Sequence, residues 1–206
     1  MITEENGVFH IRTDTYSYLF KIDAYGLPEH LHFGAPVKTR DAGALSCRPG
    51  LGWGTGILLD PKDTASCPDV LPLEWSGSGR GDYRESPLEL AGEPADFRYT
   101  GYKIHEGGVS MACGLPQAHD ALETLEITLS QPGAELTLFY TAFPTAIVRR
   151  TVLTNTGDKP LRLNKLMSSC VDLPGSYTMA TFNGGWIAEM RRCDTPCLLY
   201  TSRAHE

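Results

Sequence analysis

Carboxylate and aromatic side chains gather in one segment of the sequence. They are Trp53, Glu74, Trp75, Asp82 and Glu85. Sugar sites use such a set, because an aromatic ring packs against the apolar face of a sugar while polar groups orient its hydroxyls. A glycosidase also needs two carboxyl groups about 5–5.5 Å or about 6.5–9.5 Å apart, a distance that sequence spacing does not give. In the alternative interpretation, Asp82 and Arg84 pair with each other or with turn amides and have a structural role. We give this structural role the same weight as a binding role, and more weight than a catalytic role.

Candidate metal and cofactor sites are weaker. His30 and His32 stand two apart on an expected strand, hence on one face, but no third ligand accompanies them. Cys193 and Cys197 are spaced as a ligand pair, yet a zinc site needs two further partners. The glycines of residues 50–56 lack the preceding strand and following helix of a phosphate loop. We therefore expect no metal and no cofactor.

The elements that must position these residues are strands. Tyr16, Tyr18, Phe20 and Ile22 alternate with other residues and so share one face of a strand. The same period runs through residues 125–129 and 136–140, with Gln131-Pro132-Gly133 as the turn between them. Residues 147–155 and 161–167 are expected to form another hairpin. The pattern predicts an all-β, antiparallel sandwich.

The segment from Cys47 to Pro87 has a different texture. Two glycine-rich runs, residues 50–56 and 77–81, bracket a long stretch with few strand signals. Long loops without regular structure are usually functional or disordered, and aromatic residues such as Trp53, Trp75 and Tyr83 argue against disorder. We expect this segment to touch a ligand or a partner.

Composition excludes several classes of function. The chain carries 18 Lys and Arg against 25 Asp and Glu, a net charge of −7, so no basic face is available for nucleic acid. The first residues do not form a signal peptide, and no stretch approaches the ~20 apolar residues of a membrane span. These features predict a cytoplasmic protein with reduced cysteines and no membrane partner. In that setting, Arg80-Gly81-Asp82 matches a cell-adhesion tripeptide by coincidence.

Ordered matches along the chain carry a family resemblance. The segment from Cys67 to Gly77 runs directly into residues 78–84, Ser-Gly-Arg-Gly-Asp-Tyr-Arg. Further matching stretches follow in order between Asp96 and Trp186, among them residues 123–127, 139–143 and 182–186. This series resembles the amino-terminal domain of glycoside hydrolase family thirty-six, over about residues 9–196.

The resemblance implies a β-supersandwich of the galactose-mutarotase-like type, incomplete at its carboxy end. In complete members a (β/α)8 barrel follows, and the family hydrolyses terminal α-1,6-galactosides such as raffinose, stachyose and melibiose with retention. The nucleophile lies in a Lys-Trp-Asp motif of the barrel, and none of Trp53, Trp75 and Trp186 stands in such a motif. The barrel typically needs ~250 residues, more than the 206 present. We therefore assign no catalytic residue and expect this chain alone to be inactive.

The resemblance also suggests partners. Family members are often tetramers in which amino-terminal loops help wall a sugar pocket. On this basis we expect Trp53, Asp82 and Arg84 to bind an α-galactoside oligosaccharide within a homo-oligomer.

The expected domain spans residues 1–196. Residues 197–206 fit no part of the family pattern, and residues 197–202 match the translated mosaic end of a sequencing transposon. We expect this tail to be an adaptor sequence. Two alternatives stay open at this point: a free-standing carbohydrate-binding or assembly module, and a small glycosidase that uses Glu74 and Asp82.

Overall fold

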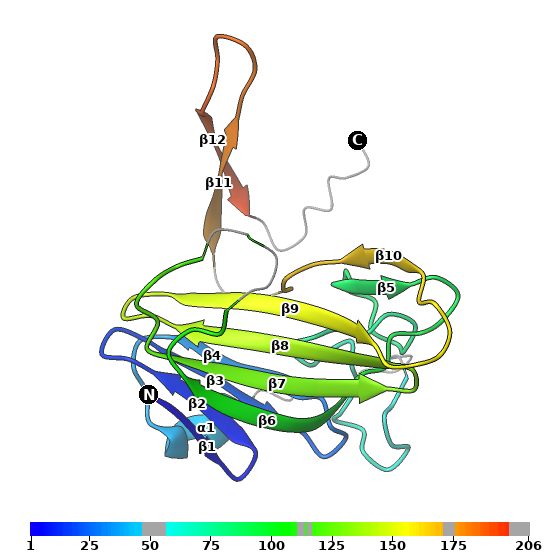
Figure 1. Cartoon of the computed structure of the whole chain (residues 1–206). Helices are drawn as coiled ribbons and strands as arrows, with labels where there is room; N and C mark the ends of the chain where they lie inside the picture. The colour runs from blue at the N-terminus through cyan, green and yellow to red at the C-terminus, as the bar shows by residue number, and fades with distance from the viewer. Residues whose placement is uncertain (47–56, 111–113, 115–116, 171–175, 198–206) are drawn as a thin grey trace. The chain divides into compact units, whose positions relative to one another are not determined.

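The computed structural model describes residues 1–46, 57–110, 114, 117–170 and 176–197, with the backbone alone for Cys197 (Figure 1). The chain divides into two compact units, Met1–Val171 and Asp172–Glu206. The first unit holds two four-stranded antiparallel sheets that lie face to face. The predicted all-β, antiparallel fold is confirmed.

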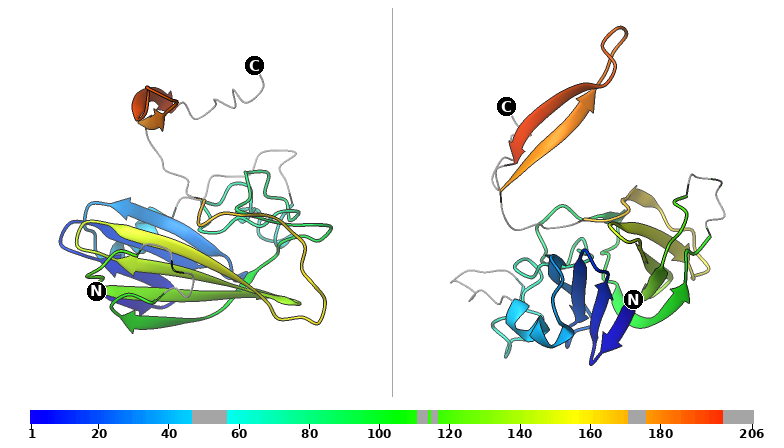
Figure 2. Two further views of the ribbon diagram at one scale, coloured as in Figure 1. Left: turned by 45° about the horizontal axis from the view of Figure 1, so that its top comes forward. Right: turned by 90° about the vertical axis from the view of Figure 1, so that its left-hand side faces the viewer.

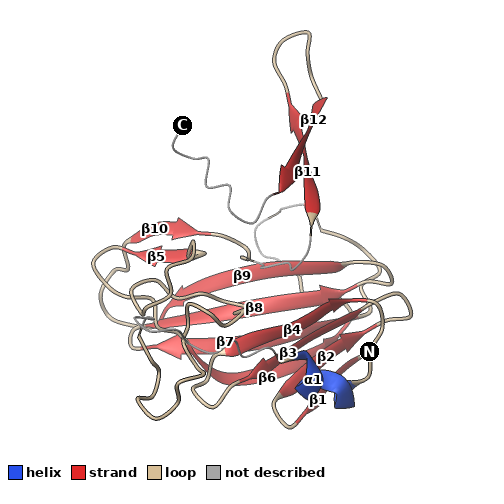
Figure 3. Cartoon of the chain, turned by 180° about the vertical axis from the view of Figure 1, so that it is seen from behind, coloured by secondary structure: helices blue, strands red, loops and turns tan. Residues whose placement is uncertain are grey.

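The first sheet is a meander near the amino terminus. Its strands are β1 (Ile2–Glu5), β2 (Val8–Arg12), β3 (Ser17–Ile22) and β4 (Pro28–Gly34), each paired antiparallel with the next. Asn6 and Gly7 both have positive φ, 53° and 78°, as a two-residue hairpin turn between twisted strands requires. A 3₁₀ turn, η1 (Thr39–Asp41), and a single helical turn, α1 (Ala42–Leu45), follow. They lie on the outer side of this sheet (Figure 3).

The second sheet has the order β6 (Arg98–Glu106), β7 (Glu123–Gln131), β8 (Ala134–Ala142) and β9 (Ile147–Asn155). The turn predicted at Gln131-Pro132-Gly133 joins β7 to β8, with Gly133 at φ 81°. Figure 2 shows the two sheets as separate layers. This sheet therefore supplies the second half of the sandwich from strands that are also consecutive in sequence.

The predicted hairpin between residues 147–155 and 161–167 is wrong. The second segment forms a short strand, β10 (Leu163–Leu166), which pairs with β5 (Leu88–Leu90) and not with β9. Hydrogen bonds from Ala91 N to Arg162 O and from Met167 N to Pro87 O extend the pairing. Leu88 and Leu90 of β5 are buried in the core of the sandwich. Strand β10 then supplies hydrogen-bond partners for the backbone N–H and C=O groups of β5.

The core lies between the two sheets and follows the period of the strands. Tyr16, Tyr18 and Phe20, predicted to share one face of a strand, are buried in this core, and Ile22 packs at its margin. The facing sheet contributes Leu125, Ile127, Leu129, Leu136, Leu138 and Tyr140. β3 is also buried on its other face, because Leu19 packs with Leu31 and with Ala42 of α1.

The second unit contains a hairpin of β11 (Tyr177–Asn183) and β12 (Arg191–Cys197). Seven residue pairs align in register, from Tyr177 opposite Cys197 to Asn183 opposite Arg191. Among the described residues, no helix has the length and apolar character that crossing a membrane requires.

Candidate functional site

Residues 57–87 connect the two sheets, and backbone contacts fix them against the sandwich. His30 N donates to Pro72 O at 2.6 Å, and Glu74 N donates to Pro28 O at 2.9 Å, so residues 72–74 continue the edge of β4. Leu71 and Leu73 are buried beneath Leu27. The segment expected to touch a ligand is thus anchored to β4 and to the core around residues 71–74. Trp53 and the glycines of residues 50–56 lie outside the described residues.

Glu74 lies in the core of the molecule, with 1% of its side chain exposed. Tyr18 Oη lies 2.8 and 2.7 Å from its two carboxylate oxygens, and Tyr140 Oη donates to Oε2 at 2.9 Å. His30 Nδ1 donates to Oε1 at 2.6 Å. The Arg149 guanidinium completes the set, with Nη2 3.2 Å from Oε2. One carboxylate therefore joins β3, β4, β8 and β9.

Arg149 matches Glu74 in charge and shape. Its Nη2 also donates to Glu74 O at 3.0 Å, and its guanidinium stands 4.8 Å from the centre of the Tyr140 ring. Burial opposes ionisation of Glu74, but the charge of Arg149 and the hydrogen bond from His30 prevail, so the pKa of Glu74 is lowered. Burial raises the pKa of Tyr18 and Tyr140 well above the ordinary value, so both phenols are donors. This ionised, enclosed carboxylate with four donor residues links strands of both sheets, and it lacks the raised pKa and the access of a general acid.

Asp82 and Arg84 pair with each other, as the alternative interpretation expects. Arg84 Nε donates to Asp82 Oδ1 at 2.9 Å and Nη2 to Oδ2 at 2.8 Å, while the backbone N of Arg84 also reaches Oδ1 at 3.1 Å. Nη2 further donates to Pro68 O at 2.9 Å. The Asp82 side chain is 1% exposed and that of Arg84 24%. Burial opposes ionisation of Asp82, yet the hydrogen bonds and charge of Arg84 lower its pKa.

Glycines make this turn possible. Gly79 and Gly81 have φ of 77° and 82°, and a Cβ on Gly81 would lie 2.8 Å from Ile57 Cβ. Arg80 turns away and pairs with Asp96, Nη2 to Oδ2 at 3.0 Å. Because Asp82 is enclosed, the Arg-Gly-Asp tripeptide presents no exposed carboxylate.

The structure separates the other predicted residues. Trp75, grouped from sequence with a possible sugar site, is buried, with 3% of its surface accessible, because residues 71–75 run along the sandwich. Glu85 lies at the surface and pairs with Lys165. His30 binds Glu74, whereas His32 Nε2 bonds Ala35 O at 2.9 Å. In the described ranges, no three His, Cys, Asp or Glu side chains group as a metal site would require.

Sequence reasoning missed Tyr83 as a candidate contact residue. Its side chain is exposed, with 76% of the residue surface accessible, although both neighbours are locked in the ion pair. Tyr83 N donates to Asp69 Oδ1 at 3.1 Å, which fixes the backbone beneath the ring. The sequence holds an aromatic residue at this place but gives no sign of its exposure, which follows from the turn. A cavity of about 270 Å³ lies beside Gly79 and Arg80 of the same turn, with Tyr25, residues 57–59 and Arg98 as its other walls.

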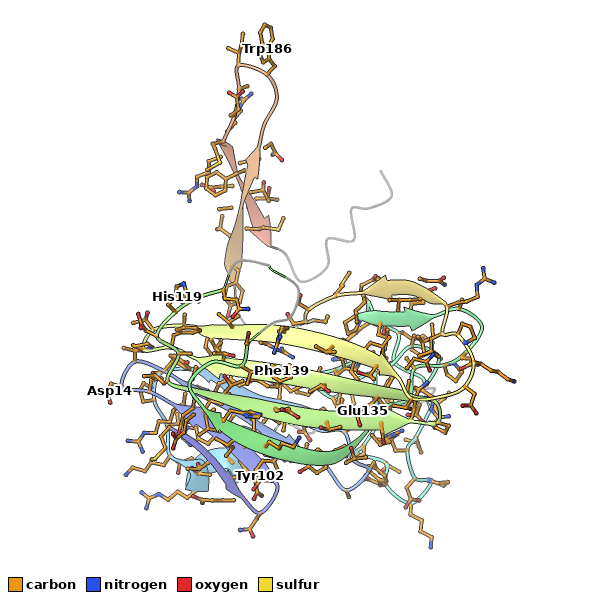
Figure 4. The ribbon with its side chains drawn as sticks, in the orientation of Figure 1. Asp14, Tyr102, His119, Glu135, Phe139 and Trp186 are labelled. Carbon is orange, nitrogen blue, oxygen red and sulfur yellow. The ribbon has the colours of Figure 1, made fainter. Side chains whose placement is uncertain are left out.

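The outer face of the second sheet carries a different set of side chains. Figure 4 marks Glu135 and Phe139, two residues of β8 on this face. Arg150 stacks over the Phe139 ring at 4.1 Å. A second cavity of about 280 Å³ lies near this face, lined by Phe143, Val148 and Arg150 among others.

Comparisons with known proteins agree with this fold. Residues 26–198 match the sequence profile of the Glycosyl hydrolase family 36 N-terminal domain. The chain is 30% identical over 191 residues to alpha-galactosidase AgaA of Geobacillus stearothermophilus, covering 86% of this chain and 26% of AgaA. It superposes with a TM-score of 0.84 and 27% identity on the crystal structure of alpha-galactosidase AgaB from the same organism, covering 96% of this chain and 28% of that one. A variant of AgaA crystallised with raffinose gives a TM-score of 0.82 at 29% identity, covering 93% of this chain and 28% of that one.

The chain thus spans about a quarter of the length of these relatives. The profile match covers most of the chain, and the antiparallel sandwich aligns with both solved structures. On these grounds the chain belongs to glycosyl hydrolase family 36, in the part that forms the family's N-terminal domain.

Proposed function

We propose that this chain is the non-catalytic amino-terminal domain of an α-galactosidase that cleaves terminal α-1,6-galactosides such as raffinose and melibiose with retention. The match to the family's N-terminal domain over residues 26–198 carries the proposal. The geometry supports it, because Glu74 and Asp82 are both enclosed and ion-paired. Neither fits the role of a carboxylic acid with a raised pKa beside a second, accessible carboxylate.

The purified chain, assayed with melibiose and a chromogenic α-galactoside, is expected to show no turnover above background. A longer polypeptide that joins this chain to a (β/α)8 barrel should hydrolyse both. Robust turnover by the chain alone, lost on Glu74→Gln, would overturn the assignment and favour a small glycosidase. Raffinose binding by the isolated chain without turnover would instead favour a free-standing carbohydrate-binding module.

We also propose that the turn of residues 81–84 contacts the sugar in the longer protein. The Arg84 side chain is 24% exposed while Asp82 holds its guanidinium in place, so Asp82 acts as a positioning residue. Tyr83 offers an exposed ring on the same rigid turn, suited to the apolar face of galactose. The expected role of Trp53 stays a prediction.

We also propose that the complete protein is a homo-oligomer, a tetramer, and that it is located in the cytoplasm.

Replacing Tyr83 tests this contact. In the longer protein, Tyr83→Ala should lower kcat/KM for raffinose by about ten-fold, since one aromatic contact contributes about 1.4 kcal/mol. Tyr83→Phe keeps the ring and should retain most of the activity. An unchanged kcat/KM in a folded Tyr83→Ala protein would remove the turn from the sugar site.

We further propose that the domain ends at residue 196 and that residues 197–206 are added sequence. Deletion of those ten residues should leave the melting temperature unchanged within error. A large loss of stability would mean that the tail packs.

A further inference from the structure

The indole of Trp75 carries a buried donor without an acceptor. Its Nε1 has no hydrogen-bond partner, and within the described part of the chain Asp23 Oδ2 is the one other buried side-chain atom in that condition. Trp75 itself is 97% buried, with 3% of its surface exposed. Leaving such a group unpaired costs about 1–3 kcal/mol, and native proteins pair nearly all of them with protein or ordered water. A partner for this N–H is therefore expected.

Trp75 borders a small cavity of about 20 Å³. Its lining includes apolar side chains of Leu27, Leu73 and Phe97 and the charged side chains of Arg80, Asp82, Asp96 and Arg98. A cavity needs at least about 10–15 Å³ and two to four polar partners to hold a water molecule. The volume meets the first condition, the charged side chains of the lining are candidates for the second, and the cavity is too small for a sugar.

Asp96 has the acceptor capacity that the cavity requires. Arg98 Nη2 reaches its Oδ1 at 2.7 Å and Arg80 Nη2 reaches its Oδ2 at 3.0 Å. A carboxylate has about four lone-pair sites, so two sites of Asp96 stay available. Asp82 differs, because three donors of Arg84 and the side chain of Ser76 already occupy its oxygens.

We infer that one water molecule occupies this cavity, accepts the hydrogen bond of Trp75 Nε1 and donates to the Asp96 carboxylate. The water links the buried segment of residues 73–75 to Asp96, which lies two residues before the start of β6. Through the ion pair of Asp96 with Arg80, it also anchors the base of the turn that carries Tyr83. The inference concerns the fold of the domain and does not depend on the proposed function.

Water contacts of the indole protons test the inference on the ¹⁵N-labelled 206-residue chain. Trp75→Phe assigns the Trp75 indole signal, and Trp186, 91% exposed, is the internal control. The Trp75 N–H should show a cross-relaxation peak to water with the sign of a long-lived contact, whereas Trp186 should show the weak signal of short-lived surface water. Absence of a long-lived contact at Trp75 would overturn the proposal.

A crystal structure gives an independent readout. Density for one water is expected within hydrogen-bonding distance of both Trp75 Nε1 and Asp96, and it should vanish or move in the Trp75→Phe variant. An Nε1 that donates directly to a protein atom, or a dry cavity, would contradict the inference.

Discussion

At the scale of single residues, the ion pair of Glu74 and Arg149 is enclosed in the core, with 1% and 10% of the two side chains exposed. Removing one partner of a buried ion pair leaves an uncompensated charge and typically costs about 3–5 kcal/mol. Arg149→Met should therefore lower the free energy of unfolding by about that amount, as measured by urea denaturation. Arg150→Met is the matched control, because the neighbouring guanidinium stacks on Phe139 at the outer face and should contribute less than about 1 kcal/mol. Equal losses in the two variants would show that the buried pair has no special weight.

His10 gives the fold a dependence on pH. Its Nδ1 lies 2.8 Å from Thr39 Oγ1 and its Nε2 2.9 Å from Ser17 Oγ. Burial lowers its pKa, with further contributions from the charges of Arg12, His32 and the amino terminus. Above about pH 6.5, the ordinary value for histidine, both folded and unfolded forms are neutral at this residue. Below it the unfolded chain takes up the proton first, so acidification favours unfolding.

Unfolding free energies measured between pH 7.5 and 5.5 check this expectation. The decline on acidification should be shallower in His10→Gln than in the unmodified protein. His119→Gln replaces a histidine at the surface between β6 and β7 (Figure 4) and should leave the slope as it is. A slope unaltered by His10→Gln would assign the acid sensitivity to other groups.

At the scale of elements, the turn of residues 79–84 depends on glycine for two separable reasons. Gly81 has positive φ, and its Cβ position is blocked by Ile57. Gly92 has a similar φ of 80°, with nothing within 4 Å of its Cβ position. Gly92→Ala should cost about 1–2 kcal/mol from backbone strain alone, and Gly81→Ala should cost more. Thermal unfolding of Gly81→Ala, of Gly92→Ala and of the double variant Gly81→Ala with Ile57→Ala separates backbone strain from the clash with Ile57. Equal losses of stability in Gly81→Ala and Gly92→Ala would mean that the Ile57 side chain moves aside.

Elements with a strong period were predictable from sequence, whereas the environment of Glu74 was not. Strands β7 and β8 alternate apolar and polar residues around a Pro-Gly turn, so local chemistry decides them. Glu74 finds its donors at Tyr18, Tyr140 and Arg149, which are 56 to 75 residues away along the chain. No local pattern marks a carboxylate that is buried by distant partners. The pairing of β10 with β5 eluded prediction for the same reason.

At the scale of the whole molecule, β9 leaves an edge of the sandwich open. In the described part of the chain β9 pairs with β8 alone, and Val148 and Val152 on its outer face are 45% and 38% exposed. Exposed apolar edge strands promote association between chains. We expect the purified chain to self-associate at high concentration.

Val152→Lys should shift the chain toward a monomer in sedimentation velocity, because a charge on an edge strand opposes pairing. Thr156→Lys adds the same charge in the adjacent exposed turn and should have little effect. A sharp monomeric boundary for the unmodified chain would show that the edge is already protected.

The burial of β3 on both faces has a consequence for mutational tolerance. Ser17, Tyr18, Leu19 and Phe20 are all buried, toward α1 on one side and the second sheet on the other. In β7 the inward residues Leu125, Ile127 and Leu129 are fully enclosed, as is Thr124, but Glu126 and Thr128 are not. Saturation mutagenesis would thus find every second position permissive between Leu125 and Leu129 of β7 but a run of four restrictive positions in β3. Few substitutions are therefore expected to be tolerated at these four positions of β3.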